Sequence, residues 1–240
     1  MTLEGTRSYV LRAPGAARAV VVDPGPDDEA HLGALAAAPV ELVLITHRHA
    51  DHTAGSVRLR ALTGAPVRAA DPDHCHGAEP LRGGEVIEAA GLRIEVVATP
   101  GHTADSVSFV VLTDGTEPVV LTGDTVLGRG TTVIGEPDGS LGDYLASLDT
   151  LERLGEGRLG LPAHGPEIAG LGAAVRAYRA HRHERLAQVR AALDGLGPDA
   201  SVDDVVANVY ADVAPSVLGA ARQSVAAQLA YLRTPPRTDG

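Results

Sequence analysis

The chain has 240 residues, a formal net charge of −11 and a hydrophobic content of 44%. This length suffices for one large domain, or for one domain with a small appendage, and the apolar content can fill its core. The acidic balance argues against a general affinity for nucleic acid or anionic membranes, although a local basic groove is compatible with it.

The number of cysteines and the hydropathy of the chain bear on the cellular compartment of the protein. The single cysteine, Cys75, excludes an intramolecular disulfide. Residues 1–10 contain no long apolar segment of the kind found in a signal peptide. No stretch reaches the roughly 20 apolar residues that span a bilayer. We therefore expect a cytoplasmic protein without a membrane anchor.

In chain order, the first 121 residues alternate apolar runs with short helical patterns. The runs predict strands over 7–12, 19–22, 40–45, 67–70, 85–88, 92–98, 106–112 and 119–121. The patterns predict helices over 29–38, capped by Asp27 or Asp28, and over 53–62. Gly91 should join one strand pair and Asp114-Gly115 another, whereas 71–84 should be irregular.

The rest of the chain is mainly helical. We predict helices over 142–154, 171–193, 201–210 and 215–232, the third with Ser201 as N-cap and Asp204 at the capping-box position, and a short strand over 159–161. Strand-rich halves with helices outside indicate an α/β layered sandwich. We place it at 1–170, a helical domain at 171–233 and a disordered Pro-rich tail at 234–240.

One stretch carries unusual chemistry, Thr46-His47-Arg48-His49-Ala50-Asp51-His52, directly after the apolar run 40–45. A lone loop histidine is usually a surface residue, but solvation does not explain three histidines and an aspartate within six residues. Further candidates follow singly after later apolar runs: His102, Asp124 and His164. We expect all seven side chains to meet at one edge of a sheet.

The spacing predicts two metal sites. Because residues i and i+2 of an extended loop point the same way, His47 and His49 can reach one ion, and His102 completes its set. Asp51 and His52 can turn toward a second ion with His164, and Asp124 is placed to bridge the two.

Nitrogen and oxygen ligands with open positions are typical of catalytic zinc. Two ions about 3.5–4 Å apart can share a hydroxide and act in hydrolysis. We assign Asp51 a catalytic role besides its ligand role. Zn²⁺ is the first choice, and Mn²⁺ or iron fit the same ligand types.

Other histidines have simpler interpretations. His74 and His76 flank Cys75 in the irregular segment, where solvent exposure is favoured over a metal site. His181 and His183 lie on the predicted long helix with Arg179, Arg182 and Arg185. They form either a charged helix face or a basic lip over the active site.

The motifs His-x-His-x-Asp-His, Gly101-His102-Thr103, Gly123-Asp124-Thr125 and His164-Gly165 together resemble the metallo-β-lactamase superfamily. The resemblance covers about residues 2–168 and implies an αββα sandwich with the metals at one edge of two packed sheets. Asp124 at the bridging position, without a nearby cysteine or an export signal, argues against antibiotic hydrolysis. His49 stands where the diiron flavoprotein branch tends to have Glu, which argues against redox chemistry.

A closer resemblance, to the β-lactamase-like protein 2 group, rests on residues 99–106, 122–133, 143–148, 162–166 and 178–185. That group contains a mitochondrial single-strand endoribonuclease, fungal polyketide-releasing thioesterases and bacterial hydrolases. It implies a small winged-helix-like domain after the sandwich. It also implies that Tyr144 lies near the metals, where its hydroxyl could touch substrate; packing on its own helix is the alternative.

Three functions remain open. The first is a dinuclear metal hydrolase that uses a bridging hydroxide on a small ester or thioester, with Tyr144, Arg129, His181 and Arg182 as substrate contacts. The second is a single-strand endoribonuclease, with Arg129, Arg179, Arg182 and Arg185 on phosphates. The third is a non-enzymatic partner-binding module. A mononuclear-iron dioxygenase is a related alternative. The sequence does not indicate the oligomeric state.

Overall fold

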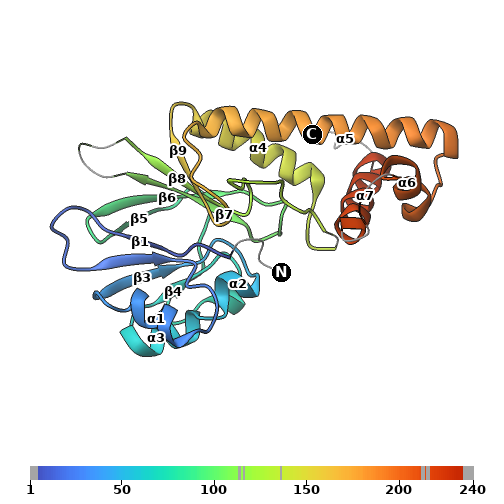
Figure 1. The fold of residues 1–240 in the computed structure, drawn as a ribbon. Coiled ribbons are helices and arrows are strands. Elements are labelled where there is room, and N and C mark those ends of the chain that lie inside the picture. Colours follow the sequence, from blue (N-terminus) through green and yellow to red (C-terminus); the bar gives the residue numbers. More distant parts are fainter. Residues whose placement is uncertain are drawn as a thin grey trace.

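The computed structural model describes residues 5–112, 115, 117–135, 137–211, 214 and 217–234. Two sheets lie face to face, with helices on their outer sides (Figure 1). The first sheet contains, in spatial order, β1 (Tyr9–Leu11), β2 (Ala19–Val22), β3 (Val40–Leu44) and β4 (Val67–Arg68). The second contains β5 (Val86–Ala89), β6 (Leu92–Ala98), β7 (Val107–Leu112), β8 (Val119–Gly123) and β9 (Leu159–Pro162).

The central core lies between the sheets. Val22 and Leu44 of the first sheet belong to the same buried cluster as Ile94, Phe109 and Leu121 of the second. Alternate strand residues face opposite sides of a sheet, so neighbouring residues such as Val21 and Val43 face outward, where Leu32 and Leu59 cover them. The αββα layering predicted from the sequence is therefore confirmed.

The helices on the first sheet are α1 (Glu29–Leu35), α2 (Ala50–Thr53) and α3 (Ser56–Thr63). Asp28 is the N-cap of α1, since its side chain accepts a hydrogen bond from the His31 N–H. The helix predicted over 53–62 is in fact two. Ala54 and Gly55 separate them, and the chain passes tightly over α1 there, since a Cβ at Gly55 would meet the Leu32 side chain at 2.7 Å.

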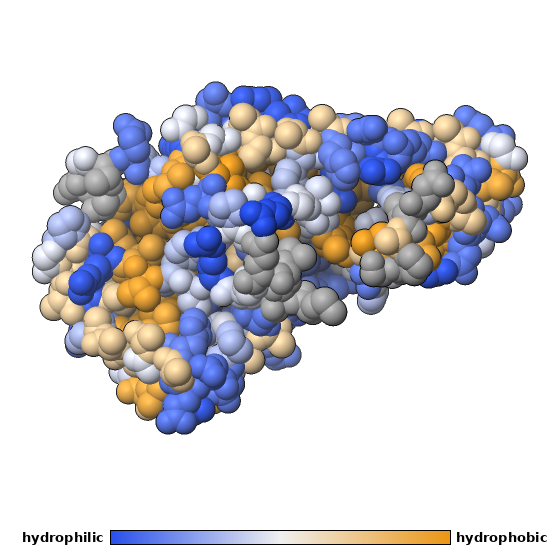
Figure 2. Space-filling model, viewed as in Figure 1, coloured by the Kyte–Doolittle hydropathy of each residue, from blue (hydrophilic) through white to orange (hydrophobic). Residues whose placement is uncertain are grey.

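On the second sheet lie α4 (Leu141–Gly155) and the first half of α5 (Leu171–Leu196). Leu148 and Val175 pack there against Val110 and Val120. The second half of α5 runs past the sandwich and packs, through Val189, on α6 (Val202–Val209) and α7 (Leu218–Arg233). Figure 2 shows hydrophobic residues between the sheets and again between α5 and α7.

Local signals account for most boundaries. Ser201 and Asp204 form the predicted capping box of α6. Ala90 and Gly91, both at positive φ, form the turn between β5 and β6. The segment predicted to be irregular contains one short 3₁₀ helix, Pro72–His74. Asp114, the predicted helix start at Pro215 and residues 235–240 of the tail lie outside the described residues.

The described part of 171–234 contains three helices and no strand, so the helical character of this region is confirmed. Its winged-helix-like arrangement and the domain boundary at residue 170 stay predictions, because α5 contributes to both cores. None of the helices in the described ranges is long and apolar enough to cross a bilayer.

Candidate metal centre

Strand direction brings the predicted ligands to one edge of the sandwich. β6 and β8 are both antiparallel to β7, and β9 is parallel to β8, so β6, β8 and β9 run the same way. His102, Asp124 and His164 follow the carboxyl ends of these three strands, and the stretch beginning at Thr46 follows β3.

Two glycines allow the close approach of these loops. Gly101 has φ of 135°, and a Cβ there would lie 2.4 Å from the Tyr144 Cα. Gly123 has φ of 50°, and a Cβ there would lie 2.9 Å from the Thr46 Cβ. A side chain at position 101 would push the His102 loop away from α4, and one at position 123 would push apart the loops of Asp124 and His47.

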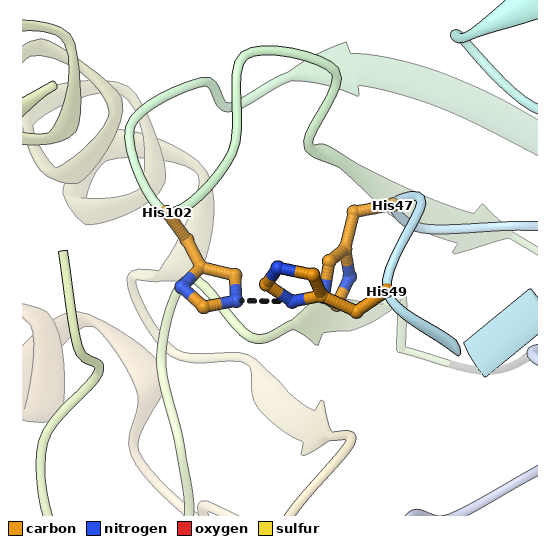
Figure 3. A group of neighbouring side chains, drawn as sticks. All are labelled: His47, His49 and His102. Atoms are coloured by element: carbon orange, nitrogen blue, oxygen red, sulfur yellow. Dashed lines mark hydrogen bonds between the residues drawn. The ribbon is translucent and has the colours of Figure 1, made fainter. Parts of the chain in front are cut away.

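Three histidines form the first group, and their rings converge (Figure 3). The His49 Nδ1 lies 2.9 Å from the His47 Nε2 and 3.1 Å from the His102 Nε2. Nitrogen ligands of a tetrahedral zinc ion with bonds of 2.0–2.1 Å are about 3.4 Å apart. The three nitrogens therefore need only a small outward movement to fit an ion.

Asp51, His52 and His164 form the second group. The Asp51 Oδ2 lies 3.4 Å from the His52 Nε2 and 3.5 Å from the His164 Nε2. Both imidazoles are buried, with 0% of His52 and 4% of His164 exposed. The group combines two nitrogens with one oxygen, as a zinc or iron site requires.

Asp124 lies between the two groups. Its Oδ2 is 3.6 Å from the His102 Nε2, and its Oδ1 is 3.3 Å from the His164 Nε2 and 3.7 Å from the His52 Nε2. Two buried atoms here, the Asp124 Oδ1 and the His52 Nε2, have no hydrogen-bond partner. A cation between them would satisfy both, so the residues present fit a metal pair.

Hydrogen bonds orient each ring. The His102 Nδ1 lies 2.8 Å from the Val133 carbonyl, and the His164 Nδ1 lies 3.0 Å from the Gly5 carbonyl. Each Nδ1 must donate to its carbonyl, which leaves the Nε2 lone pair facing the site. Thr6 donates to the Asp51 Oδ2 at 2.6 Å.

Asp23, which the sequence motifs did not single out, is the acceptor for His52. Its Oδ2 lies 2.9 Å from the His52 Nδ1 and accepts from the Thr46 hydroxyl at 2.7 Å, while its Oδ1 accepts from the Thr46 N–H. Asp23 directly follows β2, as the ligands follow other strands, and that position was the available signal. Its φ of 51° is unusual for a residue other than glycine.

Arg48 anchors the ligand loop from the side opposite the rings. Its guanidinium pairs with Asp138, lies 3.6 Å from the Asp105 Oδ1 and 3.7 Å from the Asp71 Oδ2. These three carboxylates come from three separate loops. Arg48 therefore ties the loop of His47 and His49 to the loop of His102.

The two groups open into a pocket of about 430 Å³. Its lining residues are His49, Ala50, Asp51, His102, Asp124, Leu127, Thr131, Thr132, Val133 and His164. Pockets of this volume hold small molecules.

The sequence of residues 1–164 matches the family described as the metallo-beta-lactamase superfamily. This chain belongs to the metallo-β-lactamase superfamily. Among curated relatives, it is 32% identical over 206 residues to the atrochrysone carboxyl ACP thioesterase of Aspergillus fumigatus, covering 82% of this chain and 62% of the relative. It is 31% identical over 225 residues to the beta-lactamase-like protein 2 homolog of Caenorhabditis elegans, covering 88% and 72%.

A third relative of this superfamily member is the hydroxyacylglutathione hydrolase of Albidiferax ferrireducens, 37% identical over 158 residues, which cover 62% of this chain and 58% of the relative. The chain thus spans about three fifths of the length of the thioesterase and of this hydrolase.

Solved structures of the superfamily share the fold. A metallo-beta-lactamase family protein from Thermus thermophilus superimposes with a TM-score of 0.75 at 24% identity, covering 95% of this chain and 88% of that one. TTHA1623 in a di-iron-bound form gives a TM-score of 0.55 at 25% identity, covering 70% and 90%.

In the absence of metal, the histidines of the first group and those of the second group differ in protonation. Burial lowers the pKa of His47 and His49, so both rings are neutral at pH 7. Burial also opposes charge on His52, but Asp23 outweighs it and raises the pKa to about 10. The adjacent carboxylates of Asp124 and Asp51 raise the pKa of His164 to about 10.

Both acidic ligands stay ionised. Burial alone would raise the pKa of Asp51, but its contacts with His164, His52 and the Thr6 hydroxyl hold that pKa well below its usual range. Burial is likewise outweighed at Asp124, whose pKa is lowered by the nearby His164 and by the charge of His52.

Metal binding should therefore release protons. At pH 7.5, His52 and His164 carry protons that a metal ion must displace, and we expect about two protons released per chain. The pKa values of both rings lie above 6.5, so the release should decline as the pH approaches 10. Calorimetric titration in buffers of different ionisation enthalpy measures this number. Proton release near zero at pH 7.5 would contradict the assignment of His52 and His164 as metal ligands.

The residues predicted to contact substrate lie in different surroundings. Tyr144 is fully buried and its hydroxyl donates to the Thr125 carbonyl at 2.7 Å, which corresponds to the packing alternative. Arg182 is 4% exposed and donates to the Thr132 carbonyl. His181 is partly buried beside it, with its Nδ1 unpartnered, whereas Arg129 is exposed next to the pocket-lining loop. None of these four lines the pocket.

The remaining candidates form no metal group among the described residues. The Cys75 thiol exchanges hydrogen bonds with the backbone of Ala69. Arg179 pairs with Asp149 and Glu152, and Arg185 lies over the Tyr210 ring and donates to Gln188. The exposed side of α5, which carries His183, thus holds charged residues that pair with other side chains of the surface.

Proposed function

We propose that this chain is a dinuclear metal-dependent hydrolase of a small ester or thioester. The observation that carries the proposal is the position of Asp124, whose two oxygens face two separate groups of ligands at distances of 3.3 to 3.7 Å. A single ion in either group would leave the side chains of the other group without a cation. The adjoining pocket is large enough for an acyl group and a sulfur or oxygen leaving group.

The named relatives support a hydrolase. One is named for the release of an acyl group from ACP, and another for hydrolysis of an acylated glutathione. Both names describe acyl transfer to water, and the family match over residues 1–164 includes all seven proposed ligands.

In the proposed mechanism, His47, His49 and His102 would hold one ion and Asp51, His52 and His164 the other, and the Asp124 oxygens face both groups. When bound, such a pair would supply a water molecule that ionises near neutral pH and a Lewis acid that polarises the substrate carbonyl. Asp51 lines the pocket, where its carboxylate would accept a hydrogen bond from water and orient it. Leu127 and Val133 offer apolar surface to the acyl chain.

We favour Zn²⁺ as the ion because the first group consists of imidazoles alone. Iron is supported by the related structure in a di-iron-bound form, and Mn²⁺ fits the oxygen ligands. Metal analysis after purification without added metal distinguishes the three.

The arginine contacts do not favour the endoribonuclease. Of the four arginines considered as phosphate contacts, Arg179 and Arg185 have partners on the helical surface and Arg182 is buried. Binding of single-stranded RNA that weakens steeply with salt would restore that hypothesis. A metal-free protein of full stability would support the non-enzymatic module.

Hydrolysis of a panel of aryl esters and acyl thioesters tests the proposal. We expect turnover that dialysis against a chelator abolishes and that Zn²⁺, Mn²⁺ or Fe²⁺ restores. The protein dialysed without chelator serves as the control. Turnover that survives complete metal removal would contradict the proposal, because no serine or cysteine nucleophile lines the pocket among the described residues.

A further inference from the structure

Two side chains of α5 hold the loop that forms one wall of the pocket. The Tyr178 hydroxyl donates to the Gly130 carbonyl at 2.8 Å and accepts from the Leu127 N–H at 3.0 Å. One turn further along α5, Arg182 donates to the Thr132 carbonyl. Tyr178 and Arg182 of α5 thus hold the loop at its beginning and its end. The same helix packs on α6 and α7.

The far end of this loop contacts two of the proposed ligands. The Val133 carbonyl accepts the hydrogen bond from the His102 Nδ1, and the Thr132 hydroxyl donates to the Asp124 carbonyl at 2.6 Å. The carbonyl that Arg182 holds belongs to the peptide group that joins Thr132 to Val133. A shift of that peptide would move the carbonyl that orients the His102 ring.

Packing alone does not explain Arg182. Its guanidinium lies 5.1 Å from the centre of the Tyr144 ring, its Nε has no hydrogen-bond partner, and no carboxylate of the described residues pairs with it. Burying a cation without a carboxylate costs free energy that an apolar side chain would avoid. Its strongest contact is the Thr132 carbonyl.

We propose that Arg182 is a positioning residue for the ion held by His47, His49 and His102. It acts through Thr132 and Val133, whose carbonyl fixes the orientation of His102. The second group depends on it less, because Asp23 orients His52, the Gly5 carbonyl orients His164, and Thr132 reaches only the backbone carbonyl of Asp124. This inference rests on the proposed metal centre, and it gives the helical region a role in holding one of the two ions.

Stepwise titration of metal-free protein with Zn²⁺ against a chromophoric chelator tests the inference. Arg182→Met keeps the length of the side chain and removes the donor. We expect it to raise the dissociation constant of one ion about 10- to 100-fold, the usual effect of losing an outer hydrogen bond to a ligand. The other constant should change by less than about threefold.

Two variants of the same helix complete the test. Arg182→Lys retains a donor and should bind both zinc ions nearly as tightly as the wild type. If Arg182→Met does not fold, the zinc affinities of Arg182→Lys are compared with those of the wild type instead. Arg179→Met removes a partly exposed arginine that pairs with Asp149 and Glu152, and it should behave as wild type. A second measurement, amide hydrogen exchange of residues 130–134, should become faster in Arg182→Met alone.

Three outcomes overturn the inference. One is wild-type affinity for both ions in Arg182→Met, and another is an equal loss at both sites, which would indicate general destabilisation. The third is unchanged hydrogen exchange in the loop. A wild-type chain that binds no divalent ion would instead overturn the metal centre itself, so the two failures are distinguishable.

Discussion

Replacing Asp124 by alanine is expected to lower kcat/KM at least about 10³-fold. The two oxygens of this side chain face both ligand groups, so its loss removes a ligand from each proposed ion at once. A bound ion contributes several kcal/mol of transition-state stabilisation, and about 4 kcal/mol corresponds to three orders of magnitude in rate. Steady-state kinetics with the best ester or thioester substrate measures the loss, and elemental analysis gives the accompanying fall in metal content.

A matched control for this substitution is Asp149→Ala. Asp149 is an exposed carboxylate on α4 that pairs with Arg179, so its loss should leave kinetics and metal content unchanged. Asp124→Asn adds a second comparison, because the amide keeps the size and one acceptor oxygen but cannot bind both ions as a carboxylate does. Near-normal turnover in Asp124→Ala would refute the bridging role.

Asp23→Ala is expected to destabilise the metal-free protein by about 3 kcal/mol or more. Three buried donors, the Thr46 N–H, the Thr46 hydroxyl and the His52 Nδ1–H, would lose their acceptor. Each orphaned buried donor costs about 1–3 kcal/mol. Denaturant unfolding of metal-free wild type and variant measures the difference, with the exposed Asp27→Ala as the control.

Asp23→Asn separates stability from ligand orientation. Its amide N–H₂ would face the His52 Nδ1, which would then accept a hydrogen bond and leave the proton on Nε2. A protonated Nε2 cannot bind a metal ion, so we expect affinity for one ion to fall about 10- to 100-fold. The loss of stability should be smaller than in Asp23→Ala. Zinc affinity equal to wild type would show that Asp23 does not set the tautomer of His52.

The ligand set could be predicted from the sequence because each ligand lies next to a strand end. Apolar runs marked the strands, and side chains with metal-binding chemistry follow several of them. The structure brings His102, Asp124 and His164 to one edge because β6, β8 and β9 share a direction, and the other four candidates reach the same edge from the end of β3. That prediction needed no knowledge of how loops pack.

The contacts that support the ligands could not be predicted in the same way. The Gly5 carbonyl meets His164 across 159 positions of the chain, and the Val133 carbonyl meets His102 across 31. Backbone acceptors have no signature in side-chain sequence. Asp23 is the exception, because the sequence shows its position after β2, although it does not show that the side chain is buried.

The substrate contacts proposed on α4 and α5 show a second limit. A helical pattern tells which residues share a face, but not whether that face borders a pocket or a core. Tyr144 and Arg182 both point into the interior, between α4, α5 and the loop of Thr132. The same limit applies to 53–62, because the close approach of Gly55 to Leu32 of α1 is a tertiary contact that no local pattern shows.

A crystal structure of the zinc-loaded protein, with anomalous data at the zinc edge, tests the central claim most directly. Our account predicts two anomalous peaks about 3.5–4 Å apart. One should lie among His47, His49 and His102, the other among Asp51, His52 and His164, with the Asp124 carboxylate between them. Rings turned away from one another, with no peak among them, would contradict it.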